Sequence, residues 1–240
     1  MTAEQWARTV RHQLGLGRLL PLGGPRDGAW ISEDAATAVL RAAVEELRDV
    51  RLGGVRIGLA DPADAREPAV PPPPSALPPG PLRLTAEFEA TLAQPVPVTA
   101  ERLRSALART AAGSLGLELG AVDLRVTGLL DEESPRERQP EEPRPVEPAA
   151  AGSGDEGRAG EAALAVSGVT GLTGLLGRPV QITERASEGA LPRRHVRVEL
   201  AVDRRALDVA RAVRARVEQA LPDHPTVTVL VTAVPGQERF

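Results

Sequence analysis

The sequence has no cysteine, lysine, asparagine or tyrosine among its 240 residues. Without cysteine, a disulfide framework, a thiolate nucleophile and a zinc–thiolate site are all excluded. Without lysine, the chain lacks the phosphate-binding residue of a Walker-type loop and the amine of a Schiff base. Every basic side chain is arginine or histidine. Codon usage in a GC-rich genome explains this bias most simply, and arginine-specific recognition of anions is the functional alternative.

Acidic residues outnumber basic ones, so the net charge is −4 at pH 7 and the pI is about 5.6. Binding to nucleic acid usually requires a basic surface, so we expect no nucleic-acid partner. No uninterrupted apolar run approaches the roughly 20 residues of a membrane-spanning helix. The first residues also lack the apolar core of a signal peptide. We therefore expect a cytoplasmic protein.

One order of elements occurs twice in the chain: helix, strand, strand, helix, strand. The two copies cover residues 32–130 and 161–234. Such a repeat indicates a duplicated unit and decides the fold class. We predict an α+β protein of two related units, each with its helices packed on a small, mainly antiparallel sheet. The predicted divisions are an N-terminal segment 1–29, a first unit 30–130, a linker 131–160, a second unit 161–234 and a tail 235–240.

The first unit is predicted to open with a helix. Ser32 is a good N-cap, and the acidic residues after it suit the positive end of the helix dipole. The glycine pair 53–54 should end this element before a short strand. The clearest strand alternates apolar and polar side chains from Leu82 to Leu92, which is typical of one dry and one wet face. A helix capped by Thr99 and a final strand with inward-facing Val122, Leu124 and Val126 should close the unit.

Two segments look unable to form a core. Residues 61–81 are rich in proline, which favours extended backbone and cannot donate to a sheet, so we expect an exposed insert between two paired strands. Residues 131–160 are acidic and proline-rich and have almost no large apolar side chains, so we expect a disordered linker. Both segments should be mobile and sensitive to proteases.

The second unit repeats the order with a shorter first helix. EAALAVSGVTGLTGLLG predicts a brief helix and a glycine-rich turn, and RPVQIT predicts a strand. HVRVELAVD alternates strongly and predicts the main strand. RRALDVARAVRARVEQAL predicts an amphipathic helix, and TVTVLVTAV predicts the last strand.

These segments together resemble the alkaline shock protein family of Gram-positive envelope-stress proteins. GAWISEDAATAVLRAAVEELRDVRLGG is similar to the family's Ile-Ser opening and first helix. Ser167-Gly168-Val169 takes the place of a Pro-Gly-Val turn. Val122, Leu124, Val126 and Gly128 match the family's Val-x-Val-x-Gly ending. The resemblance implies a non-catalytic protein of the cytoplasm, often associated with the membrane through partners. It supplies no active-site residues.

The segment RHQLGLGRLLPLGGPRDGAWI also resembles actinobacterial proteins that carry a nucleopolyhedrovirus fibrous-body label. The viral protein is a short coiled coil. This chain shows no sustained heptad pattern, so we do not predict a coiled coil here.

Candidate catalytic and metal sites have weak support in the sequence. His12, His195 and His224 are scattered, and surface histidines are a simpler interpretation than a metal site. No G-x-S-x-G elbow precedes a helix. The series Gly171, Gly174 and Gly177 precedes a strand instead of following one, so a flexible loop is favoured over a nucleotide site. We predict no cofactor, no metal and no catalytic residues.

Two surfaces could contact a partner or a membrane. In the helix predicted over residues 204–221, Asp208 and Arg211, and Arg214 and Glu218, are spaced so that their side chains can form ion pairs. This spacing favours a solvated helix face whose charges pair with each other. The N-terminal segment has an apolar stripe beside arginines, which suits an anionic membrane surface or packing on the protein. The candidate contact residues there are Trp6, Arg8, Val10, Arg11 and Leu14.

The sequence thus favours a non-enzymatic envelope-stress or scaffold protein that binds other proteins, in a location that includes the cytoplasmic face of the membrane. The alternative is a small-ligand-binding or enzymatic domain with a site between the two units. An enzyme needs a concave site with converging polar groups, whereas a scaffold needs only an apolar patch. The oligomeric state is left open.

Overall fold

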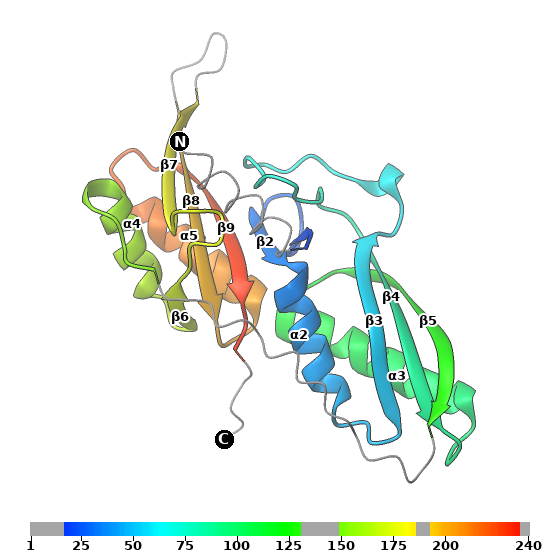
Figure 1. Cartoon of the computed structure of the whole chain (residues 1–240). Helices are drawn as coiled ribbons and strands as arrows, with labels where there is room; N and C mark the ends of the chain where they lie inside the picture. Colours follow the sequence, from blue (N-terminus) through cyan, green and yellow to red (C-terminus); the bar gives the residue numbers. More distant parts are fainter. Residues whose placement is uncertain (1–16, 131–148, 186–192, 236–240) are drawn as a thin grey trace, which may run out of the picture.

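Two mixed β-sheets, each with a pair of helices packed on it, organise the chain (Figure 1). The computed structural model describes residues 17–130, 149–185 and 193–235. Within these ranges lie the four helices α2 to α5. The predicted α+β class is confirmed. The sheets are mixed where we expected mainly antiparallel ones, because each contains parallel neighbours joined through a helix.

The first sheet has three strands. β3 (Val50–Leu59) runs antiparallel to β4 (Leu82–Thr91), and β4 runs parallel to β5 (Leu119–Leu130). Helices α2 (Glu33–Val44) and α3 (Val96–Thr110) pack against it. The predicted alternation of the central strand is confirmed, since one face is fully buried and the other is not. The buried side chains of β4 are Leu82, Leu84, Ala86, Phe88 and Ala90.

The second sheet is built around β8 (Arg193–Val202). β8 is parallel to β9 (Thr226–Ala233) and antiparallel to both β6 (Val169–Leu172) and β7 (Val180–Arg185). Helices α4 (Gly154–Leu164) and α5 (Ala206–Ala220) pack on one face of this sheet. The first sheet follows the same rule, because its middle strand also has an antiparallel partner before it and a parallel one after a helix. The duplication is therefore visible in the pairing of the strands.

The start of the described chain joins the second sheet, not the first. β1 (Leu19–Pro21) pairs with β2 (Ala29–Ser32), and β2 lies parallel to β9 with Ile31 opposite Val231. The predicted division at residue 30 thus falls inside a hairpin that belongs to the other half of the molecule. The reason is that this hairpin buries apolar side chains on both of its faces, so it needs a covered sheet.

Of three predicted ends of elements, one is confirmed and two differ in the structure. Ser32 caps α2 as expected, since its Oγ accepts the N–H of Ala35 at 3.2 Å. The glycine pair 53–54 does not end an element but lies in a bulge within β3, where Gly53 passes close to Glu87. Helix α3 begins at Val96, one turn before the expected cap, and Thr99 is buried in it.

The proline-rich insert is fully exposed only in its first part, and exposed and buried residues are interspersed in the rest. Residues 61–67 are exposed and include a short 3₁₀ turn, η1 (Pro62–Asp64). Residues 69–79, which we call the proline strap, pack on the second sheet (cyan in Figure 1). Val70 is buried there, the N–H of Ala69 donates to Pro25 and the N–H of Leu77 donates to Leu19. The expectation of a fully exposed insert is thus wrong for Val70, Pro73 and Pro79, because polyproline backbone needs no sheet partners and its apolar faces can be buried. The mobility expected from the sequence stays a prediction.

The predicted linker and turn also need correction. Helix α4 begins at Gly154, so disorder is wrong for the end of the expected 131–160 linker; residues 131–148 lie outside the described ranges. Asp155 and Glu156 in the first turn stabilise this start through the helix dipole. Part of the expected glycine-rich turn forms the strand β6.

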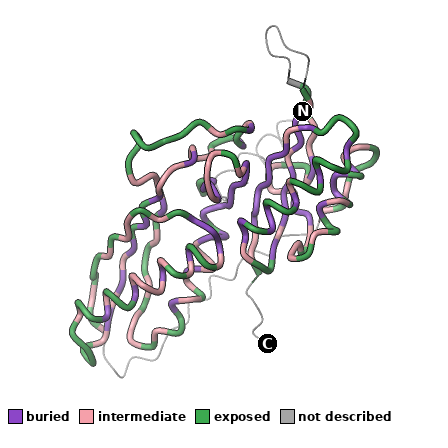
Figure 2. The backbone as a smooth tube through the Cα atoms, turned by 180° about the vertical axis from the view of Figure 1, so that it is seen from behind, coloured by how far each residue is buried: buried purple, intermediate pink, exposed green. Residues whose placement is uncertain are grey.

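One apolar core runs through both halves of the molecule, with buried residues along the strands and the inner helix faces (Figure 2). At the junction, Gly116 ends the turn η2 (Ala111–Leu115) with φ of 85°, and an added Cβ would lie 2.4 Å from Cβ of Leu207. The two units are thus packed closely against each other. A second, smaller cluster under the strap contains Leu19, Trp30, Val70 and Leu230.

Candidate functional site

The free end of the first sheet exposes a group of large apolar side chains. Ala90 lies opposite Leu129 in the register, so β4 and β5 end side by side, and α3 begins shortly after β4. The exposed fractions are 70% for Leu92, 49% for Val98, 42% for Val126 and 57% for Leu129. We call these four residues the end patch. The remaining exposed large apolar residue of the described chain, Leu164 on α4, stands apart from them.

The two edge strands of the first sheet differ in how far side chains bind their outward backbone groups. At the β3 edge, Glu33 accepts the N–H of Ile57 at 2.9 Å, and Arg41 donates to the carbonyls of Leu52 and Gly53 at 3.2 and 2.7 Å. Charged side chains thus occupy the outward backbone groups of β3, a common protection against unwanted pairing. At the β5 edge, Arg104 reaches the carbonyl of Val122 at 3.3 Å, far from the end patch. The C-terminal part of β5 carries apolar side chains instead.

The outer face of this sheet carries charged side chains that pair with one another. Ion pairs link neighbouring strands across it, and they are Arg51 with Glu89 at 2.9 Å, Arg83 with Asp123 at 2.6 Å, and Arg125 with Glu87. These side chains are largely solvated, so the pairs contribute little stability. This face resembles an ordinary water-facing sheet surface, and the end patch stands out against it.

A small pocket lies between the proline strap and the second sheet. Its volume is about 200 Å³. The four prolines Pro71–Pro74 form one wall, and strands β7, β8 and β9 form the other. We call it the strap pocket. It is lined on the sheet side by Gln181, Thr183, His195, Arg197 and Thr228.

The floor of the strap pocket follows the register of the sheet. Gln181, Arg197 and Thr228 lie opposite one another and form one row across the three strands. Thr183 and His195 begin the next row, and Nδ1 of His195 lies 3.0 Å from Oγ1 of Thr226. The opposite face of β8 is apolar and packs against the helices. Polar side chains are therefore gathered on the strap side of this sheet.

A buried charge pair lies on the same face of β8. Nη2 of Arg197 is 3.2 Å from Oε1 of Glu199, and Glu199 is fully buried. Burial raises the pKa of Glu199 to about 7, although the N–H of Leu176 and the charge of Arg197 favour its ionised form. In the described part of the structure, Nε of Arg197 and Oε1 of Glu199 make no hydrogen bond. Buried atoms of this kind call for an explanation.

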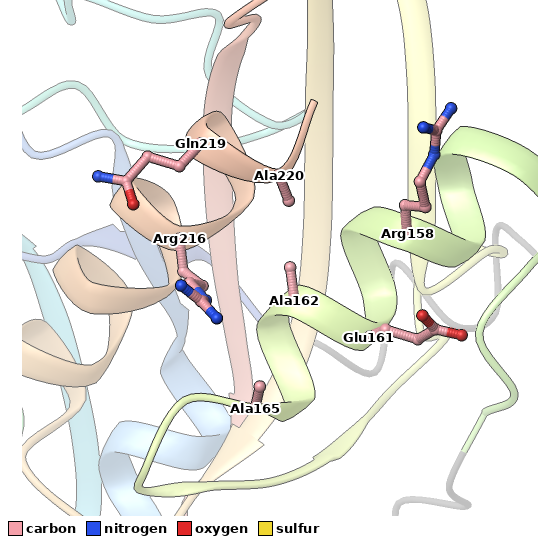
Figure 3. A pocket seen from close by; sticks show the side chains of 7 residues that line it. All are labelled: Arg158, Glu161, Ala162, Ala165, Arg216, Gln219 and Ala220. Carbon is pink, nitrogen blue, oxygen red and sulfur yellow. The ribbon is translucent and has the colours of Figure 1, made fainter. Parts of the chain in front are cut away.

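A larger hollow of about 410 Å³ lies between helices α4 and α5 (Figure 3). Ala162 and Ala220 face each other across it, while Glu161 and Gln219 point away to opposite sides. The hollow therefore has small side chains between the helices. The polar residues that line it are Arg158, Glu161, Arg216 and Gln219. Its geometry is that of a groove between two helices packed through alanine.

Of the candidate contact residues and histidines singled out from the sequence, the structure describes only His195 and His224. Trp6, Arg8, Val10, Arg11 and Leu14 lie outside the described residues, as does His12. His195 is in the strap pocket, whereas His224 lies in a turn with its Nδ1 3.2 Å from the carbonyl of Glu218. Within the described ranges, no group of three histidines or acids is placed to hold a metal.

The glycine series has a structural role. Gly171 is in β6, and Gly174 and Gly177 shape the loop that follows, where the N–H of Gly177 donates to the carbonyl of Gly174. The same loop presents the N–H of Leu176 to Glu199 at 3.0 Å. The loop thus holds a carboxylate of the chain itself.

Two arginines of α5, Arg211 and Arg214, bind the β1–β2 loop and not their own helix. Arg211 pairs with Asp27 in the β1–β2 loop, and Asp208 pairs with Arg205 at 2.7 Å. Arg214 donates to the carbonyl of Arg26. The predicted pair of Asp208 with Arg211 is therefore wrong, because the fork of Arg211 finds two carboxylate oxygens and two hydrogen bonds on Asp27.

No protein-family model matches the chain, and no curated protein matches it. Among the described residues, no helix is both long and apolar enough to cross a membrane.

Proposed function

We propose that this protein is a non-enzymatic scaffold that binds other proteins, and that its binding surface is the end patch together with the adjoining edge of β5. The observation that carries the proposal is that four of the five exposed large apolar residues of the described chain lie in β5, directly after β4 or at the start of α3. They are Leu92, Val98, Val126 and Leu129. Apolar groups that gather in this way on an otherwise charged surface are typical of protein contact sites.

The edge of β5 suggests how the partner binds. An extended segment can add to an exposed strand, with main-chain hydrogen bonds providing affinity and alternate side chains providing specificity. The opposite edge of the sheet is less suited to strand addition, because Glu33 and Arg41 already bind outward backbone groups of β3. This difference supports the choice of the β5 edge. The partner we propose is a protein with an extended, apolar segment that pairs with β5 and covers Val126 and Leu129.

The cellular setting comes from the resemblance to the alkaline shock proteins. On that basis we place the scaffold in an envelope-stress response, in the cytoplasm and in contact with partners at the inner face of the membrane. This setting is independent of the end patch. If the proposed cellular setting is wrong, the end patch can still be the binding surface, and the reverse also holds.

The test compares affinity capture by three forms of the full chain: wild type, Leu129→Arg and Leu164→Arg. Leu129 and Leu164 are both exposed leucines, but Leu164 lies outside the end patch. The proposal predicts that one partner protein is captured by the wild type and by Leu164→Arg but not by Leu129→Arg. If all three forms retain the same proteins, the end patch is not the binding surface. Sedimentation velocity of the purified forms shows whether the species lost is a second copy of the chain, which would replace the proposed partner.

A further inference from the structure

The strap pocket combines features that a simple structural contact does not need. It lies between parts of the chain that are more than 100 residues apart, since Pro71–Pro74 face strands from the second unit. The strap is held in place beside it. The hydroxyl of Thr228 donates to the carbonyl of Pro71 at 2.8 Å, and Val70 is buried against Trp30. The pocket wall is thus fixed by one hydrogen bond within the pocket and by apolar packing beside it.

The backbone of the strap also favours a fixed shape. Four consecutive prolines restrict φ and lack N–H donors, so this wall requires no hydrogen-bond partners from the sheet. Ser75 then turns the chain with φ of 62°, and the N–H of Ala76 donates to the carbonyl of Pro73 at 3.2 Å. A wall that is ordered in advance lowers the entropic cost of binding a ligand.

The polar groups of the pocket converge from three strands. Gln181, Arg197 and Thr228 lie in one row, so an amide, a guanidinium and a hydroxyl are neighbours. The side chain of Arg197 keeps only 14% of its surface exposed, and its Nε has no hydrogen-bond partner within the described residues. The guanidinium therefore has donor capacity left on the pocket side of the sheet.

The charged groups on this face limit the choice of ligand. Arg197 and the buried His195 line the pocket, and Glu199 lies beside Arg197. The exposed Arg193 precedes them on the same side of β8. The four prolines of the opposite wall carry no charge. Glu199 already offsets part of the positive charge, so a monoanion suits the pocket better than a phosphate dianion. The pyrrolidine rings offer an apolar wall to a short hydrocarbon tail.

We propose that the strap pocket binds a small organic carboxylate, whose carboxyl group is received by the guanidinium of Arg197. The planar fork of arginine matches a carboxylate in two hydrogen bonds. Gln181 and Thr183 contribute polar contacts from β7, and the prolines cover the tail. The volume of about 200 Å³ admits only a small molecule. This site is independent of the end patch and of the proposed scaffold role.

The test is a titration of the full ¹⁵N-labelled chain with sodium propionate, and separately with sodium phosphate, at constant ionic strength set by sodium chloride. We expect propionate to cause saturable shifts at the amides of Thr183, Arg197 and Thr228, and phosphate to bind more weakly. The absence of saturable propionate shifts, or tighter binding of phosphate, would overturn the proposal.

Variants assign the effect to the pocket. Removal of Arg197 alone would leave Glu199 buried without its partner, so the double variant Arg197→Gln/Glu199→Gln is used to keep the pair neutral. It should weaken propionate binding about tenfold or more, since a charge-assisted contact is lost. Gln181→Ala, which leaves the pair intact, should weaken binding a few-fold.

The matched control is Arg83→Gln. Arg83 also lies on a strand and pairs with a carboxylate, that of Asp123, but on the solvated face of the first sheet. It should bind propionate as the wild type does. Equal binding by the double variant and the wild type would overturn the proposal, as would equal weakening by Arg83→Gln.

Discussion

The guanidinium of Arg211 holds the carboxylate of Asp27 through two hydrogen bonds, 2.7 Å from Nε to Oδ1 and 3.1 Å from Nη2 to Oδ2. The N–H of Gly24 adds a third at 2.7 Å to Oδ2. These contacts fix the β1–β2 loop on helix α5, near the other end of the chain. Because β1 and β2 are strands of the second sheet, the ion pair of Asp27 with Arg211 helps to hold helix α5 against that sheet.

Replacement of Asp27 by asparagine should lower the free energy of unfolding by about 1–2 kcal/mol, since the pair is partly exposed and the charge-assisted bonds are lost. Burial raises the pKa of Asp27, but the hydrogen bonds from Arg211 and Gly24 outweigh it and hold the pKa below 3.8. The stabilisation is therefore complete at neutral pH and is lost as the pH falls through that lowered pKa. Urea denaturation at pH 6 measures it. Asp208→Asn, in an exposed pair with Arg205, is the control and should change stability by under about 0.5 kcal/mol.

Glu199 should make the protein less stable as the pH rises. Its pKa is about 7 in the folded state against an ordinary 4.5, so the folded protein binds this proton more tightly than the unfolded chain does. The contribution is full below pH 4.5 and is lost as the pH rises to about 7, on the order of 3 kcal/mol in all. Denaturation of wild type and Glu199→Gln from pH 5 to pH 8 tests this. The variant should gain stability relative to wild type over that range, and a constant difference would contradict the assignment.

Gly116 and Gly113 offer a matched pair at the junction of the two units. Gly116 has φ of 85°, and a Cβ there would lie 2.4 Å from Leu207. Gly116→Ala should therefore cost about 2 kcal/mol or more in the free energy of unfolding. Gly113 has nothing within 4 Å of an added Cβ, so Gly113→Ala should be neutral or up to about 1 kcal/mol more stable. Equal effects of the two changes would show that the junction is not tightly packed.

The strap should protect its own amides from hydrogen exchange. The N–H groups of Ala69 and Leu77 bond to carbonyls beside the second sheet, whereas that of Ala63 bonds only to the exposed side chain of Asp61. Exchange should be slow at Ala69 and Leu77 and fast at Ala63. Val70→Ala removes buried methyl groups and should speed exchange at the first two by about tenfold. Exchange at Ala69 and Leu77 as fast as at Ala63 would mean that the strap is not docked.

Much of the fold could be predicted because it follows from periodicity. The alternation from Leu82 to Leu92 predicts β4, the apolar stripe of α5 predicts a helix, and Ser32 predicts a cap, all of which depend on neighbouring residues alone. The repeated order of elements predicts the matching strand pairings of the two halves.

The rest depends on contacts between distant residues. Nothing local to residues 19–32 shows that they pair with β9, and the prolines 71–74 give no sign of the sheet that they cover. The alternation of HVRVELAVD predicts a strand but indicates no role for Arg197 and Glu199. Both residues lie in the middle of the most strongly alternating strand of the second unit. Their burial could not be predicted, because the cover on their side of the sheet is the proline strap, which comes from a distant part of the chain. The end patch was hidden because Val126 fits an inward position in the alternation and still lies at an open edge.

The most direct test of the scaffold role places a photo-crosslinking amino acid at Leu129 in one form of the full chain and at Leu164 in another, both expressed at native levels in the native cell. Both positions are exposed, but only Leu129 lies beside the free edge of β5. The proposal predicts that irradiation joins a defined partner protein to the Leu129 form and that the Leu164 form gives no such product. The same products from both positions, or none from Leu129, would contradict it.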